Sequence, residues 1–408
     1  MGEFLFIILV VLVVARIAGS IARKLGQLPI LGELIAGVVL GVITLYGPFS
    51  HYAEIELSKE FKILADLGIF FLMLMAGMEI EIKELVKASK AGLLVAFGGV
   101  VLPIVLGVSL GMAVLPASHL KLVQCLFLGV VLSITAIPAL SRVLIELDLL
   151  KTRMGHTLIS AAIIDDIIGL LLLSIVMGLM KDGAVLSLGV FGLLLAKITV
   201  FFIAAFLYGR FIMPLCVKHL SRLKIVEVEF SFVLVSAFAM GLLAEYAHMH
   251  FIIGALVTGM LVNKEVFSEG IVESVKQKLS AVTLGFFAPL FFVFVGLHVD
   301  IGAIGKAPLF AIALLFFAII GKVVGAGVPA RMLGFSWRES ISMGFGMNGR
   351  GAVELVVAAV ALEMGLFTQQ GPVTPLLGSV FSSIIIMTII TTLLVPFGMK
   401  LFLPPAEK

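Results

Sequence analysis

A small set of charged residues lies within stretches that are otherwise apolar. The acids are Glu33, Asp66, Asp165, Asp166 and Glu354, and the bases are Lys197, Lys322 and Arg350. An ionised side chain at the centre of a bilayer costs roughly 2.5–3.5 kcal/mol on insertion scales, so each group needs a partner or a task. Buried carboxylates and amines of this kind mark ion pathways and proton relays. We therefore expect ion and proton binding at some of these positions and structural ion pairs at others.

The elements that hold these residues are transmembrane helices. Of the 408 residues, 61% are hydrophobic and 13% are charged, and the mean hydropathy is +1.25. Apolar runs of about 20 residues recur, each long enough to cross a ~30 Å hydrocarbon layer. Met1–Phe4 lacks a basic segment and a cleavage site, so we expect the first span to be retained. Cys125 and Cys216 have no metal-ligand spacing. The chain is predicted to be an all-α membrane protein.

Hydrophobic runs that are bounded by charged residues or by clusters of Pro and Gly predict about thirteen transmembrane spans. The predicted spans are 4–22, 28–46, 60–79, 90–114, 122–146, 156–180, 187–214, 228–247, 249–263, 279–300, 307–330, 337–361 and 376–402. With this count, most of the 28 Lys and Arg residues fall on one side. The basic residues on the other side are Lys59, Lys62, Lys121, Lys181 and Lys306. The positive-inside rule then predicts an external N-terminus and a cytoplasmic C-terminus, in a cell (inner) membrane.

Asp165 and Lys322 are predicted to lie at the same depth. Asp165 lies nine residues after His156, which begins its span, or ~14 Å from the cytoplasmic end at 1.5 Å per residue. Lys322 lies eight residues before Ala330 on a span of opposite direction, or ~12 Å from that side. Opposite charges at one depth predict a buried ion pair.

The same layer contains two segments that weaken a helix. Pro138, in the segment 133–138, removes a backbone donor and disfavours helix before it. The segment 344–351 contains four glycines in eight residues. Each lies in the middle of three spans, which predicts two inverted six-helix repeats whose discontinuous helices cross at the ion site. Ser133 and Thr135 are candidate ligands beside the two aspartates, and Thr135 and Arg350 are candidates for neutralising the free helix ends.

The motifs at these positions resemble a known family. Ala161–Ile167 with its Asp165-Asp166 pair, the break at 133–138 and Lys322 look like the two-aspartate bacterial sodium/proton antiporters and their Kef-type relatives, within the monovalent cation/proton antiporter superfamily. The segments 28–37, 71–79 and 348–354 add to the likeness. The resemblance covers the whole chain.

The resemblance implies a homodimer and a division into two domains. A scaffold and dimer domain would comprise 1–89 and 228–306, and a core transport domain would comprise 90–186 and 307–408, with a linker helix at 187–227. By the same analogy, Asp166 binds the transported cation and the proton in turn, and Asp165 is the partner of Lys322. No cofactor, enzymatic activity or nucleic-acid partner is implied; the expected partners are Na⁺ (or Li⁺ or K⁺), protons and membrane lipid.

Two departures from the Kef-type pattern bear on the transported ion. Those proteins carry a cytoplasmic nucleotide-binding domain, whereas this sequence stops at Lys408, so we do not expect that control. They also usually have Gln-Asp where this chain has Asp165-Asp166, which favours an electrogenic sodium/proton exchanger. A K⁺/H⁺ antiporter without the regulatory domain is the alternative.

Other residues favour structural roles. Arg350 and Glu354 are spaced i,i+4, which predicts a structural ion pair that braces the broken helix. Glu33 and Asp66 are interpreted as interfacial or packing acids. The glycines Gly37, Gly41, Gly254 and Gly259 predict close helix packing.

Two other functional classes are disfavoured. An aspartyl protease needs two carboxylates that share a water, but neighbours on a helix point about 100° apart. A channel would need a selectivity filter, which no segment resembles. The paired broken helices with ionisable groups favour a secondary antiporter with alternating access, and the resemblance implies that a rigid core moves against a scaffold.

Overall fold

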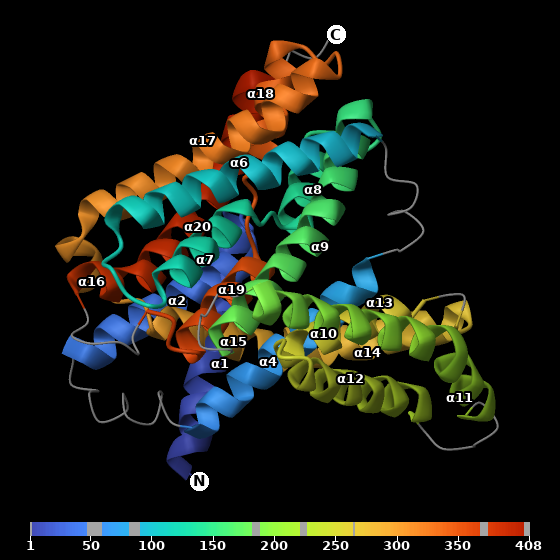
Figure 1. The fold of residues 1–408 in the computed structure, drawn as a ribbon. Coiled ribbons are helices and arrows are strands. Elements are labelled where there is room, and N and C mark those ends of the chain that lie inside the picture. The colour runs from blue at the N-terminus through green and yellow to red at the C-terminus, as the bar shows by residue number, and fades with distance from the viewer. Residues whose placement is uncertain are drawn as a thin grey trace. The chain divides into compact units, whose positions relative to one another are not determined.

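The regular structure of this chain is helical. The computed structural model describes residues 2–46, 59–80, 90–181, 188–220, 227–263, 266–367 and 374–403. Within those ranges every regular element is a helix (Figure 1). Nine described helical runs are long and apolar enough to cross a membrane, and three shorter apolar helices accompany them: Pro29–Thr44, Lys121–Ser133 and Phe251–Leu261. The prediction of a multi-pass, all-α membrane protein is confirmed.

The chain divides into two compact units. The first contains Met1–Ile21, Gly32–Ile82 and Met177–Leu297, and the second contains Ala22–Leu31, Lys83–Val176 and His298–Lys408. Each unit is therefore assembled from segments that are distant in sequence. We describe each by itself.

The first unit is built from helices of both halves of the chain. Its helices are α1 (Gly2–Lys24), α2 (Pro29–Tyr46), α4 (Lys59–Glu79), α10 (Leu188–Leu207), η1 (Tyr208–Ile212), α11 (Met213–Leu220), α12 (Val228–Tyr246), α13 (Phe251–Leu261), α14 (Glu269–Val282), η2 (Thr283–Phe287) and α15 (Ala288–Leu297), where η denotes a π-helical turn and where α1 and α2 cross the boundary between the units. Glu33 is buried here, and its Oε1 lies 3.5 Å from Nη1 of Arg16. This contact agrees with the packing role predicted for Glu33.

Glycines allow the helices of the first unit to approach closely. A Cβ on Gly77 of α4 would lie 2.1 Å from the Leu256 carbonyl oxygen and 3.0 Å from the Cα of Gly259 on α13. A Cβ on Gly37 of α2 would lie 2.9 Å from the Cα of Gly296 on α15. No side chain fits at such distances, so only glycine permits these crossings. The packing role predicted for Gly37 and Gly259 is confirmed.

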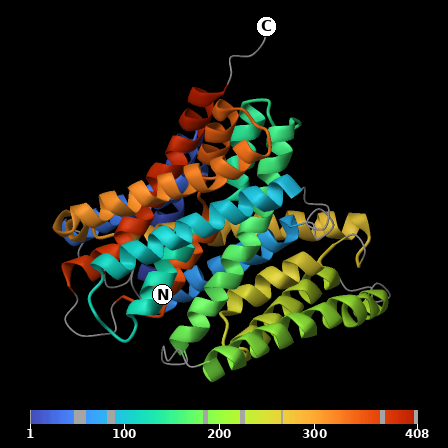
Figure 2. The same cartoon turned by 45° about the horizontal axis from the view of Figure 1, so that its top comes forward.

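The second unit contains the charged residues that the sequence singled out at membrane depth. Its helices are α6 (Lys90–Val114), α7 (Lys121–Ser133), α8 (Ile137–Glu146), α9 (Arg153–Lys181, to Val176), α16 (Ile301–Lys306), α17 (Pro308–Met332), α18 (Trp337–Gly346), α19 (Ala352–Glu363) and α20 (Pro375–Phe402). In Figures 1 and 2, α6 and α17 run side by side. A Cβ on Gly98 of α6 would lie 2.1 Å from the carbonyl oxygen of Gly325 on α17, so these backbones touch.

One predicted span begins too late. The run predicted at 279–300 starts at Glu269, as α14. Its first turns carry acids and lysines, which a hydropathy criterion excludes from a span. Val275 and Leu279, which are four residues apart, are nevertheless buried on one face. An amphipathic helix of this kind extends an apolar span into polar sequence.

Candidate functional site

The helix predicted at 122–146 is interrupted where the sequence indicated. α7 ends at Ser133 and α8 begins at Ile137, and between them Ile134 (φ −71°, ψ 140°) and Ala136 (φ −104°, ψ 117°) are extended. Pro138 lies in the first turn of α8, where its missing N–H is not needed for the helix. The chain thus presents a helix C-terminus and a helix N-terminus at one place.

The glycine-rich segment interrupts a second helix. α18 ends at Gly346 and α19 begins at Ala352. The two interruptions contact one another: the Ala136 N–H donates to the Gly349 carbonyl at 2.7 Å, and the Thr135 hydroxyl donates to the Met347 carbonyl at 2.8 Å. Backbone groups that the helices leave unsatisfied are therefore paired between the two breaks.

The Asp165–Lys322 ion pair predicted from depth is present in the structure. Lys322 Nζ on α17 lies 2.9 Å from Asp165 Oδ2 on α9, and neither side chain exposes any surface. A Cβ on Gly99 of α6 would lie 4.0 Å from Lys322 Nζ, so α6 passes within van der Waals distance of the ammonium group. Two buried charges tolerate a low dielectric only as such a pair.

The second carboxylate, Asp166, is buried next to Asp165 in the chain. Asp166 follows Asp165 on α9 and is 7% exposed. The Asp165 Oδ1 atom accepts no hydrogen bond from the described residues, and the Thr135 hydroxyl lies beside that carboxyl. The Ser133 hydroxyl is buried and donates to the Val130 carbonyl at 2.8 Å, so its oxygen retains lone pairs. Ser133, Thr135 and Asp165 are thus on the elements that meet here, while their roles as ligands stay predictions.

A second buried ion pair lies in the broken helix. Arg350 Nη1 lies 2.8 Å from Glu354 Oε1, and both side chains are fully buried. The same guanidinium donates to the carbonyls of Val131 at 2.6 Å and Leu132 at 3.0 Å, at the C-terminus of α7. A cation there complements the partial negative charge of the helix end. Arg350 therefore ties α19 to the end of α7.

Asn348 was not among the predicted site residues. It is 2% exposed, its Nδ2 donates to the Ile319 carbonyl at 3.3 Å, and its Oδ1 accepts no hydrogen bond from the described residues. Ile319 lies three residues before Lys322, so the amide sits near the ion pair. The signal in the sequence is an amide within a glycine-rich segment at membrane depth, and an uncharged amide is less distinctive there than an ionisable group.

The family described as sodium/hydrogen exchanger, transmembrane, matches residues 8–402 of this sequence. The chain belongs to the sodium/hydrogen exchanger family. It is a transporter, a monovalent cation/proton antiporter that performs Na⁺/H⁺ exchange, and not an enzyme. The membership agrees with the resemblance stated from the motifs.

Named relatives of this exchanger span its full length. The Na(+)/H(+)-K(+) antiporter GerN of Bacillus cereus is 31% identical over 98% of this chain and 96% of its own length. The Na(+)/H(+) antiporter of Enterococcus hirae is 27% identical over 98% of each chain. The structure of the sodium proton antiporter MjNhaP1 from Methanocaldococcus jannaschii matches with a TM-score of 0.71 at 18% identity, covering 99% of both chains. This last likeness concerns the fold.

Lys322→Ala in this exchanger should lower thermal stability, because it leaves Asp165 charged and without its 2.9 Å partner. A double-mutant cycle with Asp165→Asn, measured by thermal unfolding in detergent, should give a coupling well above ~0.5 kcal/mol. The exposed pair of Lys278 and Glu227 is the control, since exposed ion pairs contribute about 0–1 kcal/mol. Additive effects at Asp165 and Lys322 would contradict the prediction.

Proposed function

We propose that Asp166 is the carboxylate that binds the transported cation and the proton in turn. The observation that carries the proposal is the 2.9 Å pair between Lys322 and Asp165, which supplies a counter-charge for one of the two adjacent acids. A negatively charged Asp166 is costly in low dielectric and becomes tolerable when it holds a cation or a proton. The site then changes the side of the membrane that it faces only when Asp166 holds a cation or a proton. This couples the flux of the cation to the flux of protons without a covalent step.

The ligands that we propose around the cation are oxygens. Ser133 and Thr135 lie in or next to the interruption of α7 and α8, and Asp165 Oδ1 is buried beside Thr135. Carboxylate, hydroxyl and carbonyl oxygens are the ligands that hard cations prefer. Unwound backbone at the end of a half-helix adds carbonyl oxygens of the same kind.

We assign Na⁺ as the preferred cation and place the chain in the two-aspartate branch, with K⁺/H⁺ exchange as the alternative. The Asp165-Asp166 pair supports the first assignment, and the name of GerN, which includes potassium, supports keeping the second.

The test of the ion assignment is proton flux in proteoliposomes of purified protein. Na⁺ and Li⁺ should each dissipate a pH gradient at concentrations at which K⁺ does not, and protein-free vesicles give the background. Equal responses to K⁺ and Na⁺ would favour the alternative.

The proposed architecture is thirteen crossings in two inverted six-helix repeats. The glycine contacts of the first unit support it, because Ile30–Gly37 of α2 and Ile252–Gly259 of α13 share their glycine spacing. A Cβ on Gly296 would meet the Leu34 carbonyl oxygen at 2.4 Å, and a Cβ on Gly77 would meet the Leu256 carbonyl oxygen at 2.1 Å. Leu34 and Leu256 occupy equivalent positions in the two segments. The contact of α2 with α15 therefore corresponds, in the proposed repeat, to the contact of α13 with α4.

We further propose an elevator motion in which a core of 90–186 and 307–408 moves against a scaffold of 1–89 and 228–306, joined by a linker helix at 187–227. The presence of two compact units, each built from both halves of the chain, supports this division. We also propose that the protein is a homodimer formed through the scaffold. It lies in the inner membrane, with its N-terminus outside and its C-terminus in the cytoplasm. The distribution of basic residues supports this orientation.

A further inference from the structure

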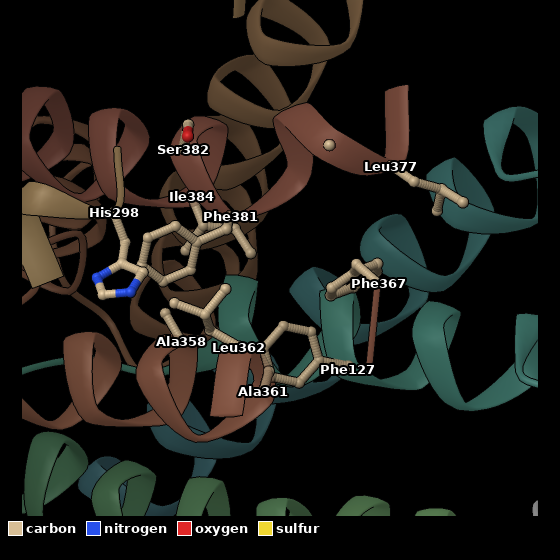
Figure 3. A pocket seen from close by; sticks show the side chains of 11 residues that line it. Phe127, His298, Ala358, Ala361, Leu362, Phe367, Leu377, Phe381, Ser382 and Ile384 are labelled. Carbon is tan, nitrogen blue, oxygen red and sulfur yellow. The ribbon is translucent and has the colours of Figure 1, made fainter. Parts of the chain in front are cut away.

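A cavity of about 80 Å³ lies within the second unit, among α7, α19 and α20 and beside His298 (Figure 3). Most of its lining is apolar, contributed by alanine, leucine, isoleucine and phenylalanine side chains. Ser382 and His298 supply polar atoms, and the Ser382 Oγ accepts a hydrogen bond from the Asp300 N–H at 2.9 Å. The mechanism proposed above does not use this space.

The α19 and α20 walls of the cavity continue to Glu354. On α19, Ala358 lines the cavity, and Glu354 lies four residues before it on the same face of the helix. On α20, Ile384 lines the cavity, and Thr388 lies four residues further along the same face. The Thr388 side chain is beside the Glu354 carboxyl. The two helices thus lead from the cavity to one buried acid.

The third wall ends at the partner of that acid. Phe127 of α7 lines the cavity, and the carbonyl of Val131, four residues later, accepts a hydrogen bond from Arg350. The faces of all three helices therefore converge on the Arg350–Glu354 pair. Figure 3 shows the side chains of these helices directed into the cavity.

Buried polar atoms without a hydrogen-bond partner in the described part of the chain occur on all three helices. Glu354 Oε2, Ser383 Oγ and Gln124 Oε1 are buried and have no hydrogen-bond partner among the described residues. Thr388 is close to Glu354, but its hydroxyl proton is donated to the Ile384 carbonyl at 2.9 Å. Buried polar atoms of this kind call for an explanation, and one explanation is internal water. A water needs on the order of 10–15 Å³ and about two to four polar partners; the cavity has the volume, and Ser382 and His298 supply its polar atoms.

Protonation of Glu354 would leave the buried Arg350 guanidinium compensated in part, by the end of α7. The charged groups near it are Arg350, which contacts it, and Lys322, which pairs with Asp165. Arg350 keeps its two hydrogen bonds to the carbonyls at the end of α7 whether or not Glu354 is ionised. The helix end therefore continues to compensate the guanidinium when its carboxylate partner is neutral.

We propose that Glu354 is a second proton-binding group of this antiporter, loaded and unloaded through water in the cavity and separate from Asp166. A proton delivered from cavity water binds Oε2, the charge of the second unit rises by one, and release reverses both changes. The proposal rests on the proton-coupled activity of the family and not on the assignment of Asp166.

Infrared spectroscopy of the purified full-length protein over a pH series tests it without measuring transport. The wild type should show a protonated-carboxyl stretch that Glu354→Gln removes and that Asp166→Asn retains. If Glu354→Gln fails to fold, Arg350→Gln with Glu354→Gln keeps the site neutral and must remove the same stretch. The proposal would be overturned if the carboxyl stretch persists both in Glu354→Gln and in the double variant Arg350→Gln with Glu354→Gln. This holds whatever the spectrum of Asp166→Asn shows.

The route through the cavity is tested with a filled variant. Ala358→Leu fills part of the cavity about one helical turn from Glu354, whereas Ala358→Ser fills much less of it and is the matched control. After transfer to D₂O, the carboxyl proton should exchange roughly tenfold more slowly in Ala358→Leu, equivalent to about 1.4 kcal/mol on the barrier. The same rate in both variants and the wild type would overturn the assigned route.

Discussion

Asp166→Asn should abolish exchange of Na⁺ for protons while leaving a folded protein in the membrane. Asparagine retains the size of the side chain and its ability to accept a hydrogen bond, but it carries no charge and does not bind a proton in the working range of pH. The competition of cation and proton for one carboxylate, on which coupling depends, is then lost. Asp166 is 7% exposed, and because asparagine has nearly the same size and shape as aspartate, the change in packing is small.

The measurement is dissipation of a pH gradient by Na⁺ in proteoliposomes. Asp66→Asn is the matched control, because Asp66 is an acid of the other unit that we interpret as structural, and this variant should keep its exchange. Gel filtration and thermal unfolding of both variants establish that they are folded. Exchange near the wild-type rate in Asp166→Asn would show that the transported cation and the proton bind at another residue.

Several features of the site could be predicted because depth in a membrane is set by simple geometry. Helix rise and span direction placed Asp165 and Lys322 at one level, and their side chains are 2.9 Å apart. Pro138 and the glycines of 344–351 indicated where helices stop, and the observed ends at Ser133 and Gly346 agree. In both cases a local rule decides the outcome, so no knowledge of tertiary packing is needed.

Other features depend on which helices meet and could not be read from the sequence. The guanidinium of Arg350 donates to the carbonyls of Val131 and Leu132, more than 200 positions away. The i,i+4 spacing predicted its pair with Glu354, and the position of Arg350 at a break predicted that it would neutralise a free helix end, but the sequence did not say which carbonyls it would contact. The start of α14 at Glu269 was missed for a different reason: a polar, amphipathic turn is stabilised by the face it buries, which hydropathy does not register.

Transport by this antiporter should be electrogenic, with two protons moving for each cation. Asp165, Asp166 and Lys322 lie together, which is one acid and one base more than exchange on a single carboxylate requires. If Asp166 alone traded one proton for one cation, the charge of the site would be equal on both strokes. If cation binding separates Lys322 from Asp165 and Lys322 then releases its proton, the loaded states differ by one charge.

A membrane potential then shifts the exchange equilibrium. The field contributes about 2.3 kcal/mol per charge per 100 mV, so ~120 mV corresponds to about a hundredfold change in the equilibrium ratio. The test uses proteoliposomes with fixed Na⁺ and pH gradients and a potential set by potassium and valinomycin. The same vesicles without valinomycin control for any movement of K⁺ by the protein.

A Lys322→Gln variant that retains exchange tests whether Lys322 carries the second proton or whether Asp166 alone carries the exchange. With a neutral residue at this position, the site has the same charge when it holds the cation as when Asp166 holds the proton. Exchange by this variant should therefore follow the imposed potential less than wild-type exchange does, and any dependence that remains is assigned to the proton on Glu354. A wild type whose direction and extent of exchange are independent of the potential would show that Lys322 is a structural counter-ion, which stays protonated throughout the cycle because Asp165 never leaves it.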